Sequence, residues 1–229
     1  MNTAVVWFRK CLRLHDNPAL RDACEDQSIH SILPIFILDP KIIGNHFEKF
    51  SRNRLRFLFE NLEDLDSSIQ SKSDNSLIIF WGSPAEAFQS LLSFFAHQIS
   101  LFVSDYCSEP HGRKTTQIVS ELLTKSSKAR YHFHPASHTI LDLEQTVNLA
   151  GFKNPKSMKD IEKIFSSTFS KDEHGFFQIP KSIPEPASFK TAPSSLDIQT
   201  LSDNFTGEIH SISSLKTKFS ELGFFEQTK

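Results

Sequence analysis

The sequence is poor in glycine and in cysteine, and both shortages exclude classes of binding site. Its seven glycines are scattered through 229 residues, so the clustered glycines that cradle phosphates in P-loop and dinucleotide-binding proteins are absent. The three cysteines, Cys11, Cys24 and Cys107, are odd in number and widely spaced. They form neither a disulfide framework nor a zinc-binding pattern, and they are typical of a reducing compartment.

Long apolar runs and an excess of positive charge are also missing. No apolar stretch approaches ~18 residues, and the N-terminus lacks a basic region followed by an apolar one, so the sequence predicts neither a membrane span nor a secretory signal. We therefore expect the protein in the nucleus or the cytoplasm. The net charge of −2 gives no basic field of the kind that nucleic-acid-binding proteins carry.

What the chain does contain, at its start, is a buried strand that runs into a capped helix. Residues Ala4–Phe8 are uncharged and rich in β-branched and aromatic side chains, as in a strand that is buried on both faces. Asp16 and Asn17 then offer a cap for free backbone N–H groups, and Pro18 suits the first helical turn. This pattern predicts the first half of a βαβ unit.

The same alternation of strand and helix continues along the chain. Apolar residues recur at steps of three and four in Asn53–Ile69, which predicts an amphipathic helix. Five strands alternating with helices predict an α/β fold with a five-stranded parallel, doubly wound (Rossmann-like) sheet. The further expected strands are 31–38, 77–81, 99–104 and 130–134, the further helices are 18–25, 85–95 and 115–125, and 41–51 is expected to be a polar loop.

Open parallel sheets bind their ligands outside the carboxyl ends of the strands, near the point where the strand order reverses. This rule needs only the predicted order of strands and helices, and it selects a small set of residues as candidates for binding. They are Arg9 and Lys10, Asp39, Trp81 and Gly82, and the segment 105–112.

Several polar side chains have a simpler structural interpretation. Arg13 and Asp16 are expected to form an ion pair that stabilises the fold, and Arg56 to pair with Glu60 or Glu63 of its own helix. His132 and His134 alternate on one strand face, as two metal ligands do. No third ligand stands at a suitable spacing, so the sequence predicts ordinary exposed histidines and no metal site.

From about Pro155 the composition of the chain changes. One amphipathic helix is expected over 158–169, and beyond it four prolines and many serines interrupt regular structure. The sequence therefore predicts a partly helical connector over 144–170 and an irregular, linker-like Pro/Ser-rich tail over 171–229. The four prolines are Pro180, Pro184, Pro186 and Pro193.

The opening stretch also resembles a known signature. The strings Val6–Lys10 and Leu12–Leu20 are similar, nearly without gaps, to the amino-terminal signature of the photolyase/cryptochrome family, and within it to the animal cryptochrome and (6-4) photolyase branch. Cys11 stands where that family usually has glycine or aspartate. The resemblance extends to about residue 143, which makes 1–143 the α/β domain. Ser220–Phe224 resembles the string that precedes the family's helical domain.

In this family the photochemistry belongs to FAD, which a large carboxyl-terminal helical domain holds. These 229 residues resemble only the part before that domain, so the resemblance implies no catalytic residue, no FAD and no self-sufficient lyase activity of the deoxyribodipyrimidine or (6-4) type. It implies a binding role, with protein partners, in light, clock or DNA-repair pathways. The alternatives are a fragment of a flavin-dependent (6-4)-type DNA photolyase or a binder of a small antenna chromophore.

Many family members hold an antenna chromophore, a deazaflavin or a folate, in the α/β domain. By resemblance the cofactor-binding candidates are Phe36 and Asp39, both in the string 35–40, together with Arg54 and Glu109. Cys107 stands where the family usually has aspartate, and loss of that carboxylate is expected to cost ~1–3 kcal/mol of binding free energy. The structural alternatives are that Phe36 belongs to the core, that Arg54 pairs with Glu60 or Glu63, and that Cys107 is an unreactive thiol.

Overall fold

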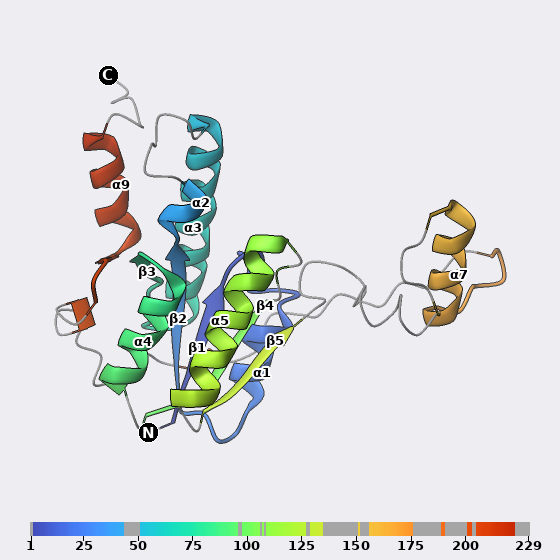
Figure 1. Cartoon of the computed structure of the whole chain (residues 1–229), viewed down its shortest axis with the longest axis horizontal. Helices are drawn as coiled ribbons and strands as arrows, with labels where there is room; N and C mark the ends of the chain where they lie inside the picture. The colour runs from blue at the N-terminus through green and yellow to red at the C-terminus, as the bar shows by residue number, and fades with distance from the viewer. Residues whose placement is uncertain are drawn as a thin grey trace.

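The predicted strands and the helices between them are present, and they form a sheet with helices on both faces (Figure 1). The computed structural model describes residues 2–43, 51–95, 98–105, 107, 109–126, 129–134, 151, 156–175, 189–190, 201–202 and 205–222. The strands that the sequence predicts are β1 (Thr3–Phe8), β2 (Ser31–Leu38), β3 (Ile78–Trp81), β4 (Ile99–Asp105) and β5 (Arg130–His134). The predicted helices are α1 (Pro18–Glu25), α3 (Arg52–Lys72), α4 (Pro84–Phe95), α5 (Pro110–Ser126) and α7 (Met158–Thr168).

The start of α1 follows the sequence prediction closely. The side chain of Asn17 accepts a hydrogen bond from the backbone N–H of Leu20 at 3.1 Å, and Pro18 occupies the first turn. Arg13 pairs with Asp16 across 3.1 Å, so the predicted ion pair before the helix is present. These contacts set the direction in which the chain leaves the end of β1.

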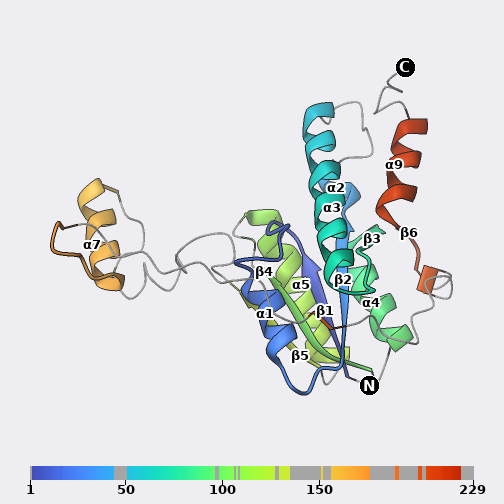
Figure 2. The same cartoon turned by 180° about the vertical axis from the view of Figure 1, so that it is seen from behind.

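The sheet has the order β5-β4-β1-β2-β3-β6, and its first five strands are parallel. Alternate side chains of β1 enter the two apolar layers: Val6 and Phe8 pack with α1 and α3, whereas Val5 and Trp7 pack with α4 and α5. The view from behind shows α1 and α3 on the face opposite to α4 and α5 (Figure 2). This is the doubly wound arrangement that continuous apolar strands require.

Three segments differ from the sequence prediction, and the first is α5, which begins at Pro110 rather than at residue 115. Pro40–Ile43, at the start of the predicted polar loop, forms the short helix α2, and residues 44–50 lie outside the described part. Within the predicted irregular tail, β6 (Glu208–His210) pairs antiparallel with β3, and α9 (Ile212–Glu221) packs against α3. The sheet therefore has six strands rather than five, and the irregular-tail prediction does not hold for 205–222.

The sixth strand and α9 form because their sequence carries its own apolar pattern. Ile212, Leu215 and Phe219 recur at helical spacing and are buried. The four prolines that predicted a linker all precede residue 194, so they do not interrupt this segment. The end of the region that resembles the family, residues 135–143, and the last two residues of the string 220–224 lie outside the described residues.

Aromatic side chains hold residues 205–222, here called the tail segment, to the β3 edge of the sheet. The Phe219 ring stacks on Trp81 at 5.2 Å between centroids and meets Phe59 edge-on at 4.8 Å. Phe205 meets Phe80 at 5.3 Å, and a Cβ at Gly82 would lie 2.5 Å from the Phe205 ring. The absence of a side chain at this glycine therefore lets the tail segment approach the end of β3.

The remaining helix, α7, does not belong to the layers that cover the sheet. Helix α7 has a capping box and lies away from the sheet in both views (Figures 1 and 2). Among the described residues, no helix combines the length and the apolar character needed to cross a bilayer. Arg56 pairs with Glu60 on α3 across 2.7 Å, as the sequence predicts.

Candidate functional site

The carboxyl ends of β1, β2 and β4 border a cleft. The strand order reverses between β1 and β4, which is where open α/β sheets bind their ligands. The cleft encloses about 130 Å³, which is below the ~300–1,000 Å³ usual for small-molecule sites, so a larger ligand would extend out through its open mouth. Its lining residues are Trp7, Arg9, Lys10, Phe36, Ile37, Asp39, Ile42, Pro84, Cys107, Glu109, His111, Gly112 and Thr115.

Arg9, at the end of β1, lines this cleft, and several contacts hold its side chain in place. Its guanidinium lies over the Trp7 ring at 4.3 Å from the ring centre. Its N–H groups donate to the Thr116 hydroxyl at 2.8 Å and to the carbonyl oxygen of Gly112 at 3.2 Å. The guanidinium thus ties the end of β1 to the first turns of α5.

Lys10 and Glu109 form an ion pair at one side of the cleft. The Lys10 ammonium lies 2.5 Å from a Glu109 carboxylate oxygen. The hydrogen bond and charge of Lys10, with smaller contributions from Arg54 and His111, hold the pKa of Glu109 below its usual range. Glu109 therefore presents a negative charge at neutral pH.

Asp39 is a buried carboxylate at the end of β2. One oxygen accepts a hydrogen bond from the backbone N–H of Lys41 at 2.9 Å, which orders the start of α2. The other oxygen lies 3.3 Å from Nε2 of His111, on α5. This contact joins β2 to α5 across the cleft, and the half-exposed imidazole remains accessible to a ligand.

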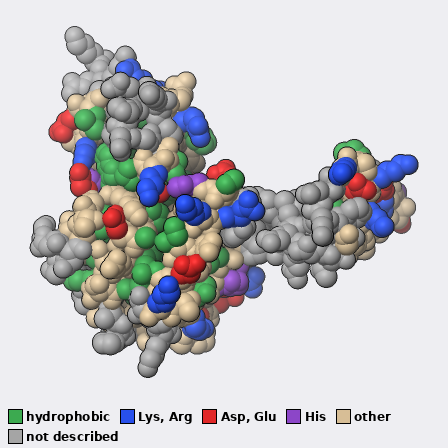
Figure 3. Space-filling view, viewed as in Figure 1, with side chains coloured by type: hydrophobic (Ala, Val, Ile, Leu, Met, Phe, Trp, Pro, Cys, Tyr) green, Lys and Arg blue, Asp and Glu red, His purple; other side chains and the backbone are tan. Residues whose placement is uncertain are grey.

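Cys107 fills the space beneath the start of α5. Its side chain is buried, and a Cβ at Gly112 would lie only 2.2 Å from its sulfur. Glycine at 112 is thus required for this packing. The space-filling view shows Lys and Arg side chains gathered around a histidine near the start of α5 (Figure 3).

The comparisons with known proteins decide the family. A family model described as DNA photolyase matches residues 4–186, which is most of the chain. The chain belongs to the photolyase/cryptochrome family.

Relatives and solved structures agree with this assignment. Cryptochrome-1 of Spalax judaei is 36% identical over 163 residues, covering 71% of this chain and 26% of the relative. The (6-4) DNA photolyase of Arabidopsis thaliana is 32% identical over 168 residues, covering 70% and 29%. The archaeal photolyase from Sulfolobus tokodaii has the same fold, with a TM-score of 0.60 at 17% identity over 88% of this chain and 41% of that one. The chain thus spans about a quarter of the length of the curated relatives it matches.

The structure brings four of the five antenna-site candidates of this photolyase/cryptochrome domain to one cleft. Phe36, Asp39, Cys107 and Glu109 line it, and Phe36 also packs in the apolar layer beneath. Arg54 lies on α3 outside the lining, although its charge acts on Glu109. These assignments to an antenna chromophore remain predictions.

Trp81 and Gly82, which the sequence predicts as binding candidates at the end of a strand, lie outside the cleft. They contact Phe219 and Phe205 of the tail segment and do not line the cleft. The cause is β6, which occupies the sheet edge beside β3.

One side-chain cluster was missed by the sequence reasoning. The structure brings Asp22 of α1 against His132 and His134 of β5. The alternating histidines were a visible signal, but their third neighbour is 110 residues away from His132. Only the position of β5 beside β4, under α1, brings it close.

Proposed function

We propose that residues 1–229 act as a binding domain of a photolyase/cryptochrome-type protein and do not form a self-sufficient photolyase. The observation that carries this proposal is the cleft at the ends of β1, β2 and β4, where apolar walls meet a few fixed polar groups. In the family, FAD and the lesion pocket belong to a helical domain. We place no catalytic residue in these 229 residues.

The favoured ligand class for the cleft is a planar antenna chromophore of the deazaflavin or folate type. Trp7, Phe36, Ile37 and Ile42 line the cleft and offer apolar surface for a ring system. His111 and the Glu109 carboxylate offer polar contacts to the edge of the ring. The Sulfolobus tokodaii photolyase, which shares this fold, holds two FAD molecules, with the implication of a novel light-harvesting cofactor, and this supports a second chromophore in this fold. When bound, such a chromophore absorbs light and passes on the excitation energy.

Cys107 weakens this site relative to other family members. The family's usual aspartate at this position is replaced by a buried thiol, packed against Gly112. The site therefore lacks one carboxylate that would hold the polar edge of the ligand. We expect the affinity to be lower by roughly 5- to 150-fold, which corresponds to a loss of ~1–3 kcal/mol.

Equilibrium titration of the purified 229-residue chain tests this proposal. A deazaflavin, a folate and FAD are added separately, and binding is followed by fluorescence anisotropy and by absorption beyond ~300 nm, where aromatic side chains no longer absorb. We expect the deazaflavin or the folate to bind at one site. Glu109→Gln should weaken that binding, whereas Glu121→Gln, farther along α5, should not change it. Absence of binding by all three ligands would contradict the antenna assignment.

A protein partner of the cryptochrome or photolyase pathways is the second candidate. The Phe57 side chain, which is 69% exposed on α3, is the position at which we test this candidate. Binding of a purified pathway protein is measured with the native chain and with Phe57→Ser. Weaker binding by the variant, with unchanged ligand binding in the cleft, supports the partner role. Equal binding by the two proteins removes Phe57 from the interface.

A further inference from the structure

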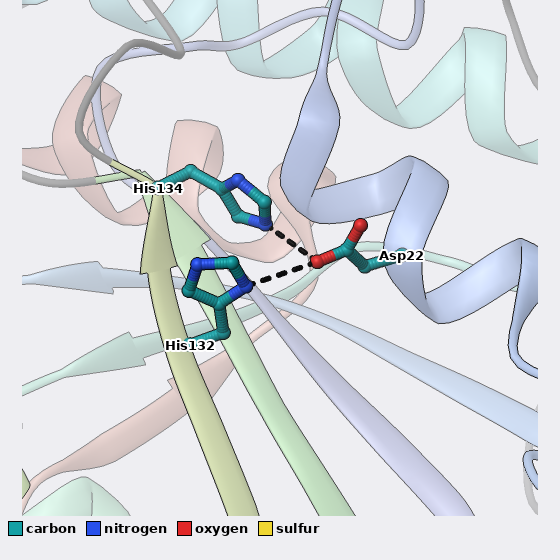
Figure 4. Close-up of side chains that lie close together, drawn as sticks. All are labelled: Asp22, His132 and His134. Atoms are coloured by element: carbon teal, nitrogen blue, oxygen red, sulfur yellow. Dashed lines mark hydrogen bonds and ion pairs between the residues drawn. The ribbon is translucent and has the colours of Figure 1, made fainter. Parts of the chain in front are cut away.

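At the β5 edge of the sheet, one carboxylate faces two imidazoles (Figure 4). Oδ2 of Asp22, on α1, lies 2.7 Å from Nε2 of His134 and 3.1 Å from Nδ1 of His132. The two histidines are two residues apart on β5, and their ring centres are 3.9 Å apart. Both rings therefore turn toward the same oxygen atom from the same face of the strand.

The three ligand atoms have the spacing that a small cation requires. They all lie within 4.8 Å of one another, and a tetrahedral zinc site with bonds of ~2.0–2.1 Å has ligand atoms about 3.3 Å apart. The two distances to the Asp22 oxygen are slightly shorter than this edge and the two nitrogens lie within 4.8 Å of each other, so rotations of the side chains are needed to bring all three atoms onto one ion. Within the described ranges, this is the one group of three or more potential ligands.

The types of ligand favour a transition metal. Two imidazole nitrogens and one carboxylate oxygen suit Zn²⁺, whereas Mg²⁺ and Ca²⁺ prefer sites made of oxygen atoms. His134 is 14% exposed, while His132 and Asp22 are 56% and 42% exposed. An ion can therefore enter from the solvent, and water can complete a fourth position.

The ring nitrogens that would bind the ion are the ones that already face Asp22: Nε2 of His134 and Nδ1 of His132. A neutral imidazole is the form that binds metal. On binding, Nε2 of His134 and Nδ1 of His132 present their lone pairs to the ion, and each remaining proton resides on the other ring nitrogen.

We propose that Asp22, His132 and His134 bind one Zn²⁺ ion and that this ion fastens the edge strand β5 to helix α1. The two elements already share a second contact nearby, because Arg130 of β5 pairs with Asp26, just beyond α1, at 2.6 Å. The ion adds a bond between segments that are about a hundred residues apart in sequence. It therefore stabilises the folded chain in proportion to its occupancy.

The test uses the untagged, full 229-residue chain after treatment with a chelator. Zn²⁺ is titrated by isothermal calorimetry, and Tm is measured with Zn²⁺ or Mg²⁺ in excess. We expect one Zn²⁺ per chain with a Kd of about 1 µM or lower, and a Tm that rises by several degrees with Zn²⁺ but not with Mg²⁺. Co²⁺ should give the visible absorption of a four-coordinate site.

Three variants make the test specific to this cluster. His132→Gln and Asp22→Asn each remove one ligand at a partly exposed position, and circular dichroism checks that they fold. Each should weaken Zn²⁺ binding by at least about tenfold, whereas His174→Gln, an exposed histidine outside the cluster, should leave it unchanged. No binding up to about 100 µM Zn²⁺, or binding that both ligand variants retain, would overturn the proposal.

Discussion

The two edges of the sheet are held in different ways. At the β6 edge, aromatic rings of the tail segment pack on Trp81, Phe59 and Phe80, and the ion pairs of Glu208 with His210 and Lys218 lie outside this apolar layer. At the β5 edge, most side chains are exposed or half-buried, and Asp22 and Asp26 hold the strand through histidine and arginine. Apolar packing responds little to pH and ions, whereas a polar seam responds to both. We therefore call the β6 edge the fixed edge and the β5 edge, whose contacts depend on charge, the adjustable edge.

The largest effect is expected from removing the central ring of the fixed edge. Phe219→Ala deletes a fully buried side chain that contacts Phe59 and Trp81, so the free energy of unfolding should fall by ~3–5 kcal/mol. Urea denaturation followed by circular dichroism measures it. The control is Phe57→Ala, which removes an exposed ring from α3. This variant should change the free energy of unfolding by less than ~0.5 kcal/mol. Equal effects of the two variants would show that the tail segment is not packed as described.

A smaller loss is expected from crowding the same edge. Gly82→Ala places a methyl group 2.5 Å from the Phe205 ring and should cost ~1–3 kcal/mol. Phe205→Leu shortens the ring side chain, so the double variant should lose less stability than the sum of the two single variants. Denaturation of all four proteins completes the cycle. Strict additivity would contradict the close approach of Phe205 to the end of β3.

Acid should loosen the adjustable edge first. Burial lowers the pKa of His134 below 6.5, so the unfolded chain binds its proton more readily than the folded chain. The stability from neutral His134 is present above pH 6.5 and is lost as the pH falls through the lower, folded-state pKa. Between pH 7 and pH 5, amide hydrogen exchange corrected for intrinsic rates should accelerate in β5 and not in α9. Equal acceleration in both elements would remove the distinction between the edges.

More acid should then act on Asp26. Hydrogen bonds from Ser28, followed by those from Arg130, lower its pKa from 3.8 to about 2. Its contribution to stability is present above pH 3.8 and is lost as the pH falls from 3.8 to about 2. Carbon NMR of the carboxyl group measures this titration directly. A midpoint near 3.8 would show that the hydrogen bonds from Ser28 and from Arg130 do not persist in solution.

The smallest effect is expected from the Arg130–Asp26 pair itself. Arg130 is mostly exposed, and such surface pairs contribute ~0.2–1 kcal/mol. Arg130→Gln should therefore lower stability only slightly, with a larger effect at low than at high ionic strength. Denaturation at two salt concentrations measures both quantities. A loss as large as that of Phe219→Ala would contradict the contrast between the edges.

The sequence was sufficient where local patterns determine the structure. The continuous apolar strands, the Asn17 cap and the period of Leu55–Ile69 predicted the parallel sheet and its helices, because each signal acts over a few residues. The tail was harder. Serines and four prolines dominated its composition, and only the spacing of Ile212, Leu215 and Phe219 indicated a buried helix.

The residues of the candidate site were also predicted only in part. Strand ends placed Arg9, Lys10 and Asp39 at the cleft, because parallel strands deliver their carboxyl ends to one edge. Trp81 was misplaced, since nothing local shows that a later strand will cover β3. The approach of Asp22 to His132 was also missed, because it depends on strand order and on the packing of α1.

Illumination of the isolated chain with damaged DNA tests the central claim most directly. The purified 229-residue protein is supplied with FAD and an antenna chromophore, mixed with DNA that carries cyclobutane or (6-4) lesions, and exposed to blue light. We expect that the number of lesions does not fall with light dose, while a chromophore still binds in the cleft. Lesion loss that increases with light dose and requires this chain would contradict the account.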